Sequence, residues 1–226
     1  ALYRLPLVNI HLQIHNPYAV SSLRECICLT LLMMIWEDTI NDFAYNASIA
    51  HIDYSLELNR DGMAVVARGF SEKISLFFQR IMEELVKLDI TEDSFELNLE
   101  QEIQNQKNWY KKQPHHQASY HLSRCIESPK FDMTESLAIL ESITLEDLVA
   151  FHARVFKQQN YEWLIHGNLT QEATMQLTQQ IEAQFDSKPV ANSQFIFVRT
   201  VQLPPKVEHV YQALAFDDEN TNSAVN

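Results

Sequence analysis

The stretch that decides the fold runs from Ser22 to Ala50 and reads SLRECICLTLLMMIWEDTINDFAYNASIA. It opens with a helix-start signal, because the Ser22 hydroxyl can accept from the backbone N–H of Glu25 while the Glu25 carboxylate reaches back to the Ser22 N–H. The run from Cys26 to Trp36 carries no charge and a single hydroxyl, which predicts a helix buried on most sides. This uncharged run is shorter than the stretch of about 20 apolar residues that spans a bilayer, so we expect this helix to lie across a sheet.

Beyond Trp36 the same stretch becomes amphipathic. Apolar residues recur at helical spacing (Ile40, Phe43, Ala44 and Ala47), while acids and amides take the other face (Glu37, Asp38, Asn41 and Asp42). One long helix, or two helices joined near Trp36, would fit this pattern. The aromatic residues Trp36, Phe43 and Tyr45 are expected to be core residues rather than a ligand site.

Composition narrows the function classes. The 226 residues are 46% hydrophobic, which is enough for a substantial core. Only three glycines occur, so there is no place for a glycine-rich phosphate loop. The 17 basic and 30 acidic residues give a net charge of −13, which disfavours nucleic acid and anionic membranes as partners.

Cysteine usage and the chain start add little about the compartment. The three cysteines do not suggest a disulfide framework, and Cys26 and Cys28 would not face each other on a helix. We interpret them as small buried hydrophobic residues. No signal peptide or transmembrane segment is recognisable. A chain that starts at Ala1 is expected to be a piece of a longer protein.

The rest of the chain alternates between strand and helix patterns. Period-two alternation predicts strands, including a hairpin around Arg60-Asp61-Gly62. Gly69, near the end of one strand, indicates a bulge or a close backbone approach. The predicted strands are 5–15, 52–58, 63–70, 161–166, 195–201 and 207–216. The predicted helices after the first begin at Ser71, Thr91 or Ser94, Gln117, Thr134, Thr144 and Thr170. In the helix after Thr91, we expect Phe95, Leu99, Ile103 and Trp109 to face inward and Glu96, Glu100, Glu102 and Lys107 to face solvent.

This order predicts an α+β fold, a mostly antiparallel sheet with helices packed on one face. We expect residues 1–203 to form one domain. Residues 204–226 begin with a proline pair and turn polar, so we interpret them as a linker and the start of a following domain.

No catalytic motif is found among the residues themselves. His11 and His15 are four apart but lie on a predicted strand, where zinc-ligand spacing for a helix does not apply. A cluster of His115, His116, His121 and Cys125 leaves open an independent hydrolase or metal enzyme, although no carboxylate is placed to orient those ligands. No GxSxG elbow occurs. The residues alone therefore predict an acidic α+β domain.

Several segments, in order, resemble motifs of the large pitrilysin and insulysin zinc peptidases. The stretch WEDTINDFAYNASIAHIDYSL of this chain resembles a helix motif of that family. The matching residues are Asp38, Ile40, Asn41, Asp42, Tyr45, Ala47, Ala50, Ile52 and Tyr54. Further matches are GFSEKI (69–74), Asn108-Trp109 with QPHHQA (113–118), ITLEDLVAF (143–151), LIHGNLTQEA (164–173) and DDENTNSAV (217–225). The resemblance covers nearly the whole chain.

The departures decide what the resemblance implies. The family's HxxEH zinc motif is absent, and Trp36-Glu37-Asp38 stands at the corresponding helix. Asp42 replaces the usual glutamate and His51 the usual glycine. The chain thus resembles the third, noncatalytic domain of these four-domain enzymes. The resemblance implies no catalytic, cofactor-binding or metal-binding residue in this chain, an inactive fragment, and zinc in the parent metalloendopeptidase.

The function implied by the resemblance is indirect. The chain would form part of the wall of a substrate chamber, with the other domains of the same polypeptide and peptide substrates as its partners. An alternative is a structural core-subunit-like member of the same superfold without peptidase activity. Bacterial members of the family favour a periplasmic over a cytoplasmic location.

Overall fold

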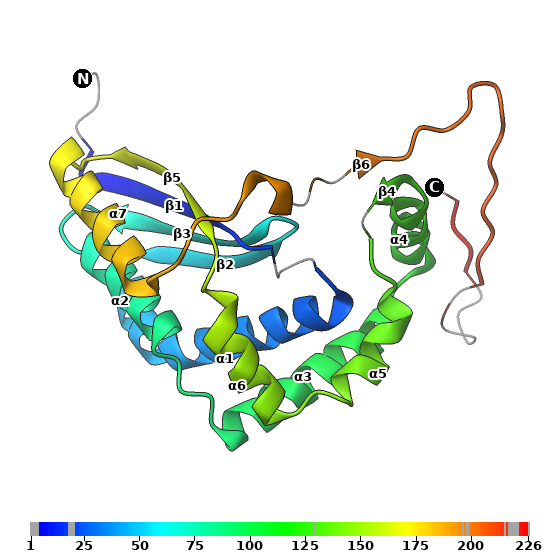
Figure 1. Ribbon diagram of the computed structural model, residues 1–226, viewed down its shortest axis with the longest axis horizontal. Coiled ribbons are helices and arrows are strands. Elements are labelled where there is room, and N and C mark those ends of the chain that lie inside the picture. The colour runs from blue at the N-terminus through cyan, green and yellow to red at the C-terminus, as the bar shows by residue number, and fades with distance from the viewer. Residues whose placement is uncertain are drawn as a thin grey trace. The chain divides into compact units, whose positions relative to one another are not determined.

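The computed structural model describes residues 5–17, 21–128, 130–195, 197, 199–214, 216 and 222–225 (Figure 1). The strands are β1 (Leu7–His15), β2 (Asp53–Asn59), β3 (Gly62–Phe70), β4 (Glu127–Ser128), β5 (Asn160–Gly167) and β6 (Arg199–Thr200). The helices are α1 (Leu23–Ile49), α2 (Ile74–Val86), α3 (Glu92–Tyr110), α4 (Pro114–Ile126), α5 (Ser136–Leu140), α6 (Leu145–Val155) and α7 (Gln171–Phe185), with 3₁₀ turns η1 (Met133–Glu135) and η2 (Asn192–Gln194).

The chain divides into two compact units, each described by itself. Unit 1 comprises residues 1–96 and 144–196, and unit 2 comprises residues 97–143 and 197–226. The predicted boundary between residues 203 and 204 is a different division and stays a prediction.

Unit 1 is built on a four-stranded sheet in the order β2-β3-β1-β5. Every neighbouring pair is antiparallel, and Ile10 of β1 lies opposite Ala67 of β3 and Ile165 of β5. This confirms the predicted α+β class with an antiparallel sheet. The first strand in the sequence is thus an interior strand of the sheet.

One face of this sheet is sealed by helices. Val8, Ile10, Leu12 and Ile14 point to this face, and each is 0% exposed. Figure 1 shows α1, α2 and α7 gathered on this side, where Phe78 of α2 packs on Trp163 of β5 with ring centroids 5.9 Å apart. Because strand side chains alternate, the other residues of the same strands point away from these helices.

Helix α1 is a single helix from Leu23 to Ile49. The Ser22 hydroxyl accepts from the Glu25 N–H at 3.2 Å, as predicted. The predicted return bond from the Glu25 carboxylate was wrong. Its two oxygens instead accept from Nη2 of Arg154 on α6, at 2.7 and 2.9 Å, because this cation offers a charged partner.

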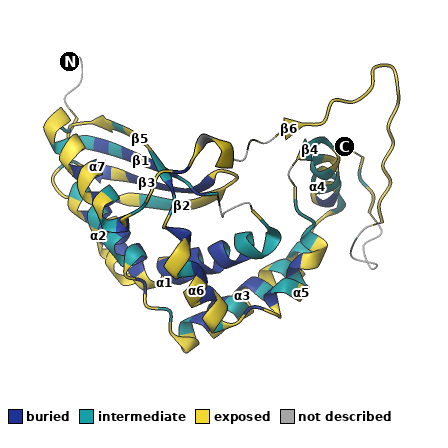
Figure 2. Ribbon diagram, viewed as in Figure 1, coloured by how far each residue is buried: buried dark blue, intermediate teal, exposed yellow. Residues whose placement is uncertain are grey.

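The two halves of α1 differ in burial, as Figure 2 shows. In the first half Trp36 is 0% exposed, and its Nε1–H donates to the Ile81 carbonyl at 2.9 Å. In the second half only a narrow stripe is buried, at Ile40, Ala44 and Ala47. Tyr45 lies off this stripe and is 67% exposed, so its prediction as a core residue was wrong. Phe43 is at the edge of the stripe and stacks on Phe77 of α2.

All three glycines lie in strands that pair with β1. A Cβ on Gly62 would stand 2.1 Å from the Ile14 carbonyl oxygen, and one on Gly167 would stand 2.2 Å from the Leu7 carbonyl oxygen. A Cβ on Gly69 would stand 2.9 Å from Ile52 Cγ1, which confirms the predicted close approach there. These positions let the neighbouring backbones come together at the two ends of the sheet.

In unit 2, Gln117 of α4 ties three backbone segments together. Its side-chain Nε2 donates to the carbonyls of Tyr110 and Lys112, both at 3.0 Å, which satisfies carbonyls at the end of α3. Its Oε1 accepts from the Phe216 N–H at 3.0 Å. Gln117 is 3% exposed, so the second glutamine of the QPHHQA motif is a buried structural residue.

Most predicted helix caps are confirmed. Thr91 caps α3 with Ser94 as its reciprocal partner, Thr144 and Asp147 form a capping box on α6, and Thr170 caps α7. Helix α2 begins later than predicted, at Ile74 rather than Ser71, since no side chain caps it.

Three other predictions were wrong. Glu102 is only 8% exposed, because the side-chain amides of Asn105 and Gln106 on the same helix donate to its carboxylate. The predicted strand 207–216 is not a strand in its described residues, 207–214 and 216. Of the predicted strand 195–201, the described residues (195, 197 and 199–201) form only β6, which pairs with the short β4. Alternation favours a strand, but a strand also requires a neighbouring backbone to pair with.

Candidate functional site

The face of the unit 1 sheet that points away from α1, α2 and α7 is the candidate functional site. We call it the open face. Its side chains are Leu7, Asn9, His11, Gln13 and His15 of β1, Asp53, Ser55, Glu57 and Asn59 of β2, Ala64, Val66, Arg68 and Phe70 of β3, and Asn160, Glu162, Leu164 and His166 of β5. Since the strand period is two, the burial of Val8 to Ile14 on the helix side fixes this set on the other side.

The centre of the open face is small and apolar between longer polar groups. His11 lies in register between Val66 and Leu164, and Leu164 is 62% exposed. Gln13 lies opposite Ala64 and Asn59 opposite Gly62, so their side chains meet diagonally across these two small residues of β3. Their amides exchange two hydrogen bonds of 3.1 and 2.7 Å. This pair holds two long side chains flat against the sheet.

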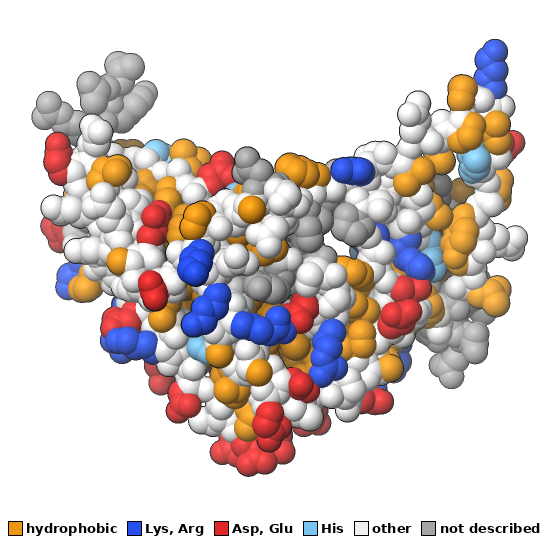
Figure 3. Space-filling view, viewed as in Figure 1, with side chains coloured by type: hydrophobic (Ala, Val, Ile, Leu, Met, Phe, Trp, Pro, Cys, Tyr) orange, Lys and Arg blue, Asp and Glu red, His pale blue; other side chains and the backbone are white. Residues whose placement is uncertain are grey.

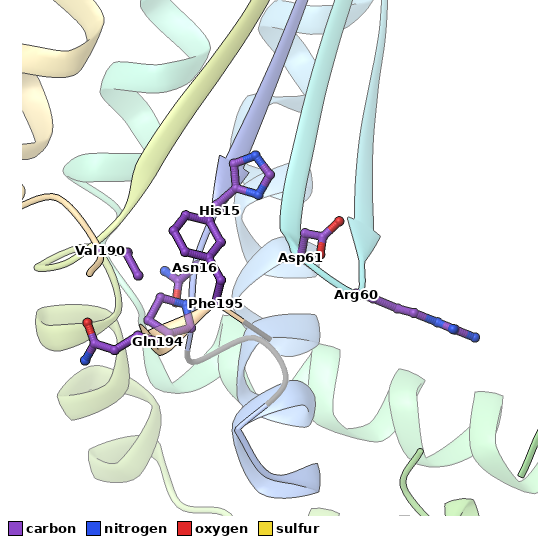
Figure 4. Close-up of a pocket in the computed structure, with 8 residues that line it drawn as sticks. His15, Asn16, Arg60, Asp61, Val190, Gln194 and Phe195 are labelled. Atoms are coloured by element: carbon purple, nitrogen blue, oxygen red, sulfur yellow. The ribbon is translucent and has the colours of Figure 1, made fainter. Parts of the chain in front are cut away.

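At one end, the open face meets a small pocket (Figure 4). The His15 ring packs on Phe195 with centroids 5.8 Å apart, and His15 Nε2 lies 3.2 Å from an oxygen of Glu162. Asn16 forms the floor, where its Nδ2–H₂ donates to the Val155 carbonyl at 2.7 Å. Figure 4 shows the Arg60 side chain extending away from the pocket. The pocket is a shallow end to the open face rather than an enclosed ligand cavity.

The open face offers binding groups, not a reaction centre. It combines histidine rings, amides, charges of both signs and one exposed leucine. Acidic and basic side chains are also interspersed over the face of the molecule in view in Figure 3. Such a surface can donate to and accept from an extended polypeptide and cover one of its apolar side chains.

The positions of the donor side chains bear on the alternative prediction of a metal enzyme. Within the described part of the chain, no three His, Cys, Asp or Glu residues come together to hold a metal ion. His115 and His116 contact each other, with ring centroids 4.1 Å apart, and Cys125 is exposed. His121 instead packs among aromatic rings, and its burial lowers its pKa. The described residues do not fit zinc, so no chemical step is derived through a metal on this chain.

The four-stranded antiparallel sheet with one face covered by helices defines an α+β domain. The chain belongs to the M16 peptidase family: residues 1–139 match the family model described as the middle or third domain of peptidase M16. Residues 142–223 match the model described as the peptidase M16 inactive domain. The chain is thus a noncatalytic segment of an insulysin-like peptidase.

Among curated proteins, the chain is similar to the insulin-degrading enzyme of Homo sapiens, with 28% identity over 92% of this chain and 21% of that protein. It is 26% identical to insulin-degrading enzyme-like 2 of Arabidopsis thaliana, over 97% of this chain and 23% of that protein. A relative in Schizosaccharomyces pombe, 25% identical over 98% of this chain and 23% of that protein, is named a putative zinc protease. The chain spans about a fifth of the length of these relatives.

Two solved structures share the fold. Pitrilysin matches with a TM-score of 0.74 and 24% identity over 80% of this chain and 19% of that chain. The peptidase M16 inactive domain from Pseudomonas fluorescens matches with a TM-score of 0.63 and 18% identity over 84% of this chain and 48% of that chain. Among the described helices, none is long and apolar enough to cross a membrane.

Sequence reasoning did not single out the open face as a site. The alternation in β1 already placed Asn9, His11 and Gln13 on one side of the strand. What was missing is the strand order, which brings Leu164 beside His11 from a segment far along the chain. The alternation of residues within one strand does not reveal which strands lie beside it in the sheet.

Proposed function

We propose that this chain forms part of the wall of the substrate chamber in an insulysin-like zinc metalloendopeptidase. The zinc and the general base belong to another domain of the parent protein. The observation that carries the proposal is the open face: one side of the sheet is sealed by helices, while the other presents solvent-exposed polar and apolar groups. The family membership and the missing HxxEH motif support a role in binding rather than in bond cleavage.

The size of the open face suits an extended peptide. Strand β1 has nine residues, which at about 3.3 Å per residue gives a surface roughly 30 Å long. A peptide lying along it gains contacts with His11 and Leu164 and loses freedom before it reaches the catalytic groups. Such a wall acts on long substrates, because a short peptide at the catalytic site does not reach it.

Kinetics of the parent enzyme test this role. Leu164→Ala and His11→Ala remove two exposed groups of the open face, and we expect KM for a long peptide to rise several-fold with kcat unchanged. A short peptide should be cleaved as by the wild type. Leu76→Ala is the matched control, because Leu76 is 68% exposed on α2, on the helix side of the sheet.

Equal effects on long and short peptides, or an equal effect of Leu76→Ala, would refute the chamber-wall role. The alternative of a structural protein without peptidase activity predicts that the parent neither binds zinc nor cleaves any peptide. Metal analysis and peptide cleavage by the purified parent separate these two functions before any variant is made.

A further inference from the structure

The ring of His121 in unit 2 is held between two aromatic residues of the C-terminal segment. We call residues 199–214 and 216 the strap. The His121 ring stacks on Phe216 at 29°, with centroids 5.6 Å apart, and lies 5.6 Å from Tyr211. Tyr120 of α4 contacts the same ring at 5.2 Å. Phe216 also packs on Trp109 and Tyr110 at the end of α3.

Both nitrogens of the His121 ring are buried, and neither has a hydrogen-bond partner among the described residues. One of them carries a proton in the neutral ring and both do in the cation. The neutral ring thus leaves one donor unsatisfied, whereas the cation would leave two donors and a charge without solvent. This packing therefore selects the neutral ring.

The charged groups nearby do not change this preference. Arg124 of α4 is a cation and opposes a second positive charge. Asp132, at the start of η1, is the acid that could pair with a cationic ring, but its oxygens are already used. They accept from the Tyr120 hydroxyl at 3.1 Å, the Thr134 N–H at 2.9 Å and Arg124 Nη2 at 2.8 Å.

Among the described residues, few other contacts hold the strap. Its start is paired through β6, and the Val201 N–H donates to the Ile126 carbonyl at 2.7 Å. Its far end is held by the Phe216 N–H on Gln117 and by the aromatic contacts. Between them Val210 is 82% and Leu214 is 88% exposed. A small change in free energy at His121 is therefore enough to shift the far end of the strap.

We propose that His121 is a proton-controlled latch, in which the neutral ring holds the Tyr211–Phe216 end of the strap on α4 and protonation releases it. Burial, and then Arg124, lower the pKa of His121 in the docked state, while Asp132 acts in the opposite direction. A released His121 regains a pKa of about 6.5 and binds protons more readily than the docked ring. Docking is thus full above about pH 6.5 and weakens as the pH falls below it.

Hydrogen exchange of the whole chain tests the latch. Exchange of the peptide covering 209–216 is measured at pH 7.5 and 5.5 and corrected for the intrinsic rate at each pH. We expect its protection to fall by up to about tenfold at pH 5.5, with the protection of β1 unchanged. A simultaneous loss in β1 would mean general acid unfolding and would overturn the proposal.

Two variants locate the effect. His121→Phe keeps a flat ring but cannot be protonated, so its strap protection should not change between the two pH values. His115→Gln removes an exposed histidine of the same helix and should respond as the wild type does. Equal pH dependence in wild type and His121→Phe would refute the latch. NMR titration of the wild-type His121 ring provides a second measurement, and an ordinary pKa with no coupled strap signal would also refute it.

Discussion

Replacing Gly167 by alanine should destabilise unit 1 far more than the same change at Gly69. Gly167 has a φ of +126°, and an alanine Cβ would lie 2.2 Å from the Leu7 carbonyl oxygen and 2.8 Å from Val8 Cα. The Leu7 carbonyl cannot simply retreat, because it also accepts from the Asn168 N–H at 2.9 Å. The clash is therefore with the backbone of β1, not with a side chain that could rotate away.

The cost follows from two terms. A non-glycine residue at this φ costs about 1–3 kcal/mol, and displacing the Leu7 carbonyl gives up a hydrogen bond worth about 1 kcal/mol. We expect Gly167→Ala to lower the free energy of unfolding by about 3 kcal/mol, which corresponds to roughly 6–12 °C in Tm. At Gly69 a Cβ would lie 2.9 Å from Ile52 Cγ1, 3.0 Å from the His51 carbonyl oxygen and 3.1 Å from Ile52 Cα, but φ is not positive there, so only an overpacking cost of about 1 kcal/mol is expected.

Urea unfolding followed by tryptophan fluorescence measures this difference. In a Trp109→Phe background the remaining tryptophans, Trp36 and Trp163, both report on unit 1. The reasoning is refuted if Gly167→Ala costs less than about 1 kcal/mol, or if Gly69→Ala costs as much as Gly167→Ala.

Three other predictions concern caps, buried partners and thiols. Thr144→Ala should lower the free energy of unfolding by about 1 kcal/mol. The backbone N–H and hydroxyl of Thr144, and then Arg24, lower the pKa of Asp147, so this stabilisation is present above about pH 4 in the wild type and is lost in more acidic solution. Urea unfolding at pH 7 and pH 3 should therefore show a smaller loss of stability in the variant than in the wild type. Trp36→Phe leaves the buried Ile81 carbonyl without its 2.9 Å donor and should cost about 1–3 kcal/mol in the same urea assay, so an unchanged midpoint contradicts the bond's importance. Burial raises the pKa of Cys26 and Cys28 to about 11, so iodoacetamide at pH 8 should label the exposed Cys125 first, and peptide mass spectrometry finding Cys28 labelled as fast would show that the helix opens.

Local signals in the sequence predicted the elements of unit 1 well. The alternation around Ile10 follows from the two-residue period of strand side chains, and the turn at Gly62 follows from the backbone freedom of glycine. Both are properties of a few adjacent residues. The caps at Ser22 and Thr144 are likewise local, since the donor and acceptor lie three residues apart. These features do not depend on where the rest of the chain lies.

The errors arose where a distant partner decides the outcome. Glu25 left its predicted cap because Arg154 lies beside it, and Tyr45 is exposed because no element covers its side of α1. The alternating residues 207–214 do not form a strand, because no neighbouring strand pairs with them among the described residues. The open face was missed for the same reason, since the strand order that joins His11 to Leu164 is a long-range property.

The place of β1 in the sheet also bears on how the protein is made. This strand leaves the ribosome before its two partners, and β3 at residues 62–70 can pair with one of its edges soon afterwards. Its other edge waits for β5 at residues 160–167. At about 5–20 residues per second, the interval between the two partners is roughly 5–20 s. Throughout that interval the nascent chain carries an incomplete sheet in which one edge of β1 is unpaired, which is the period when chaperones would have most to protect.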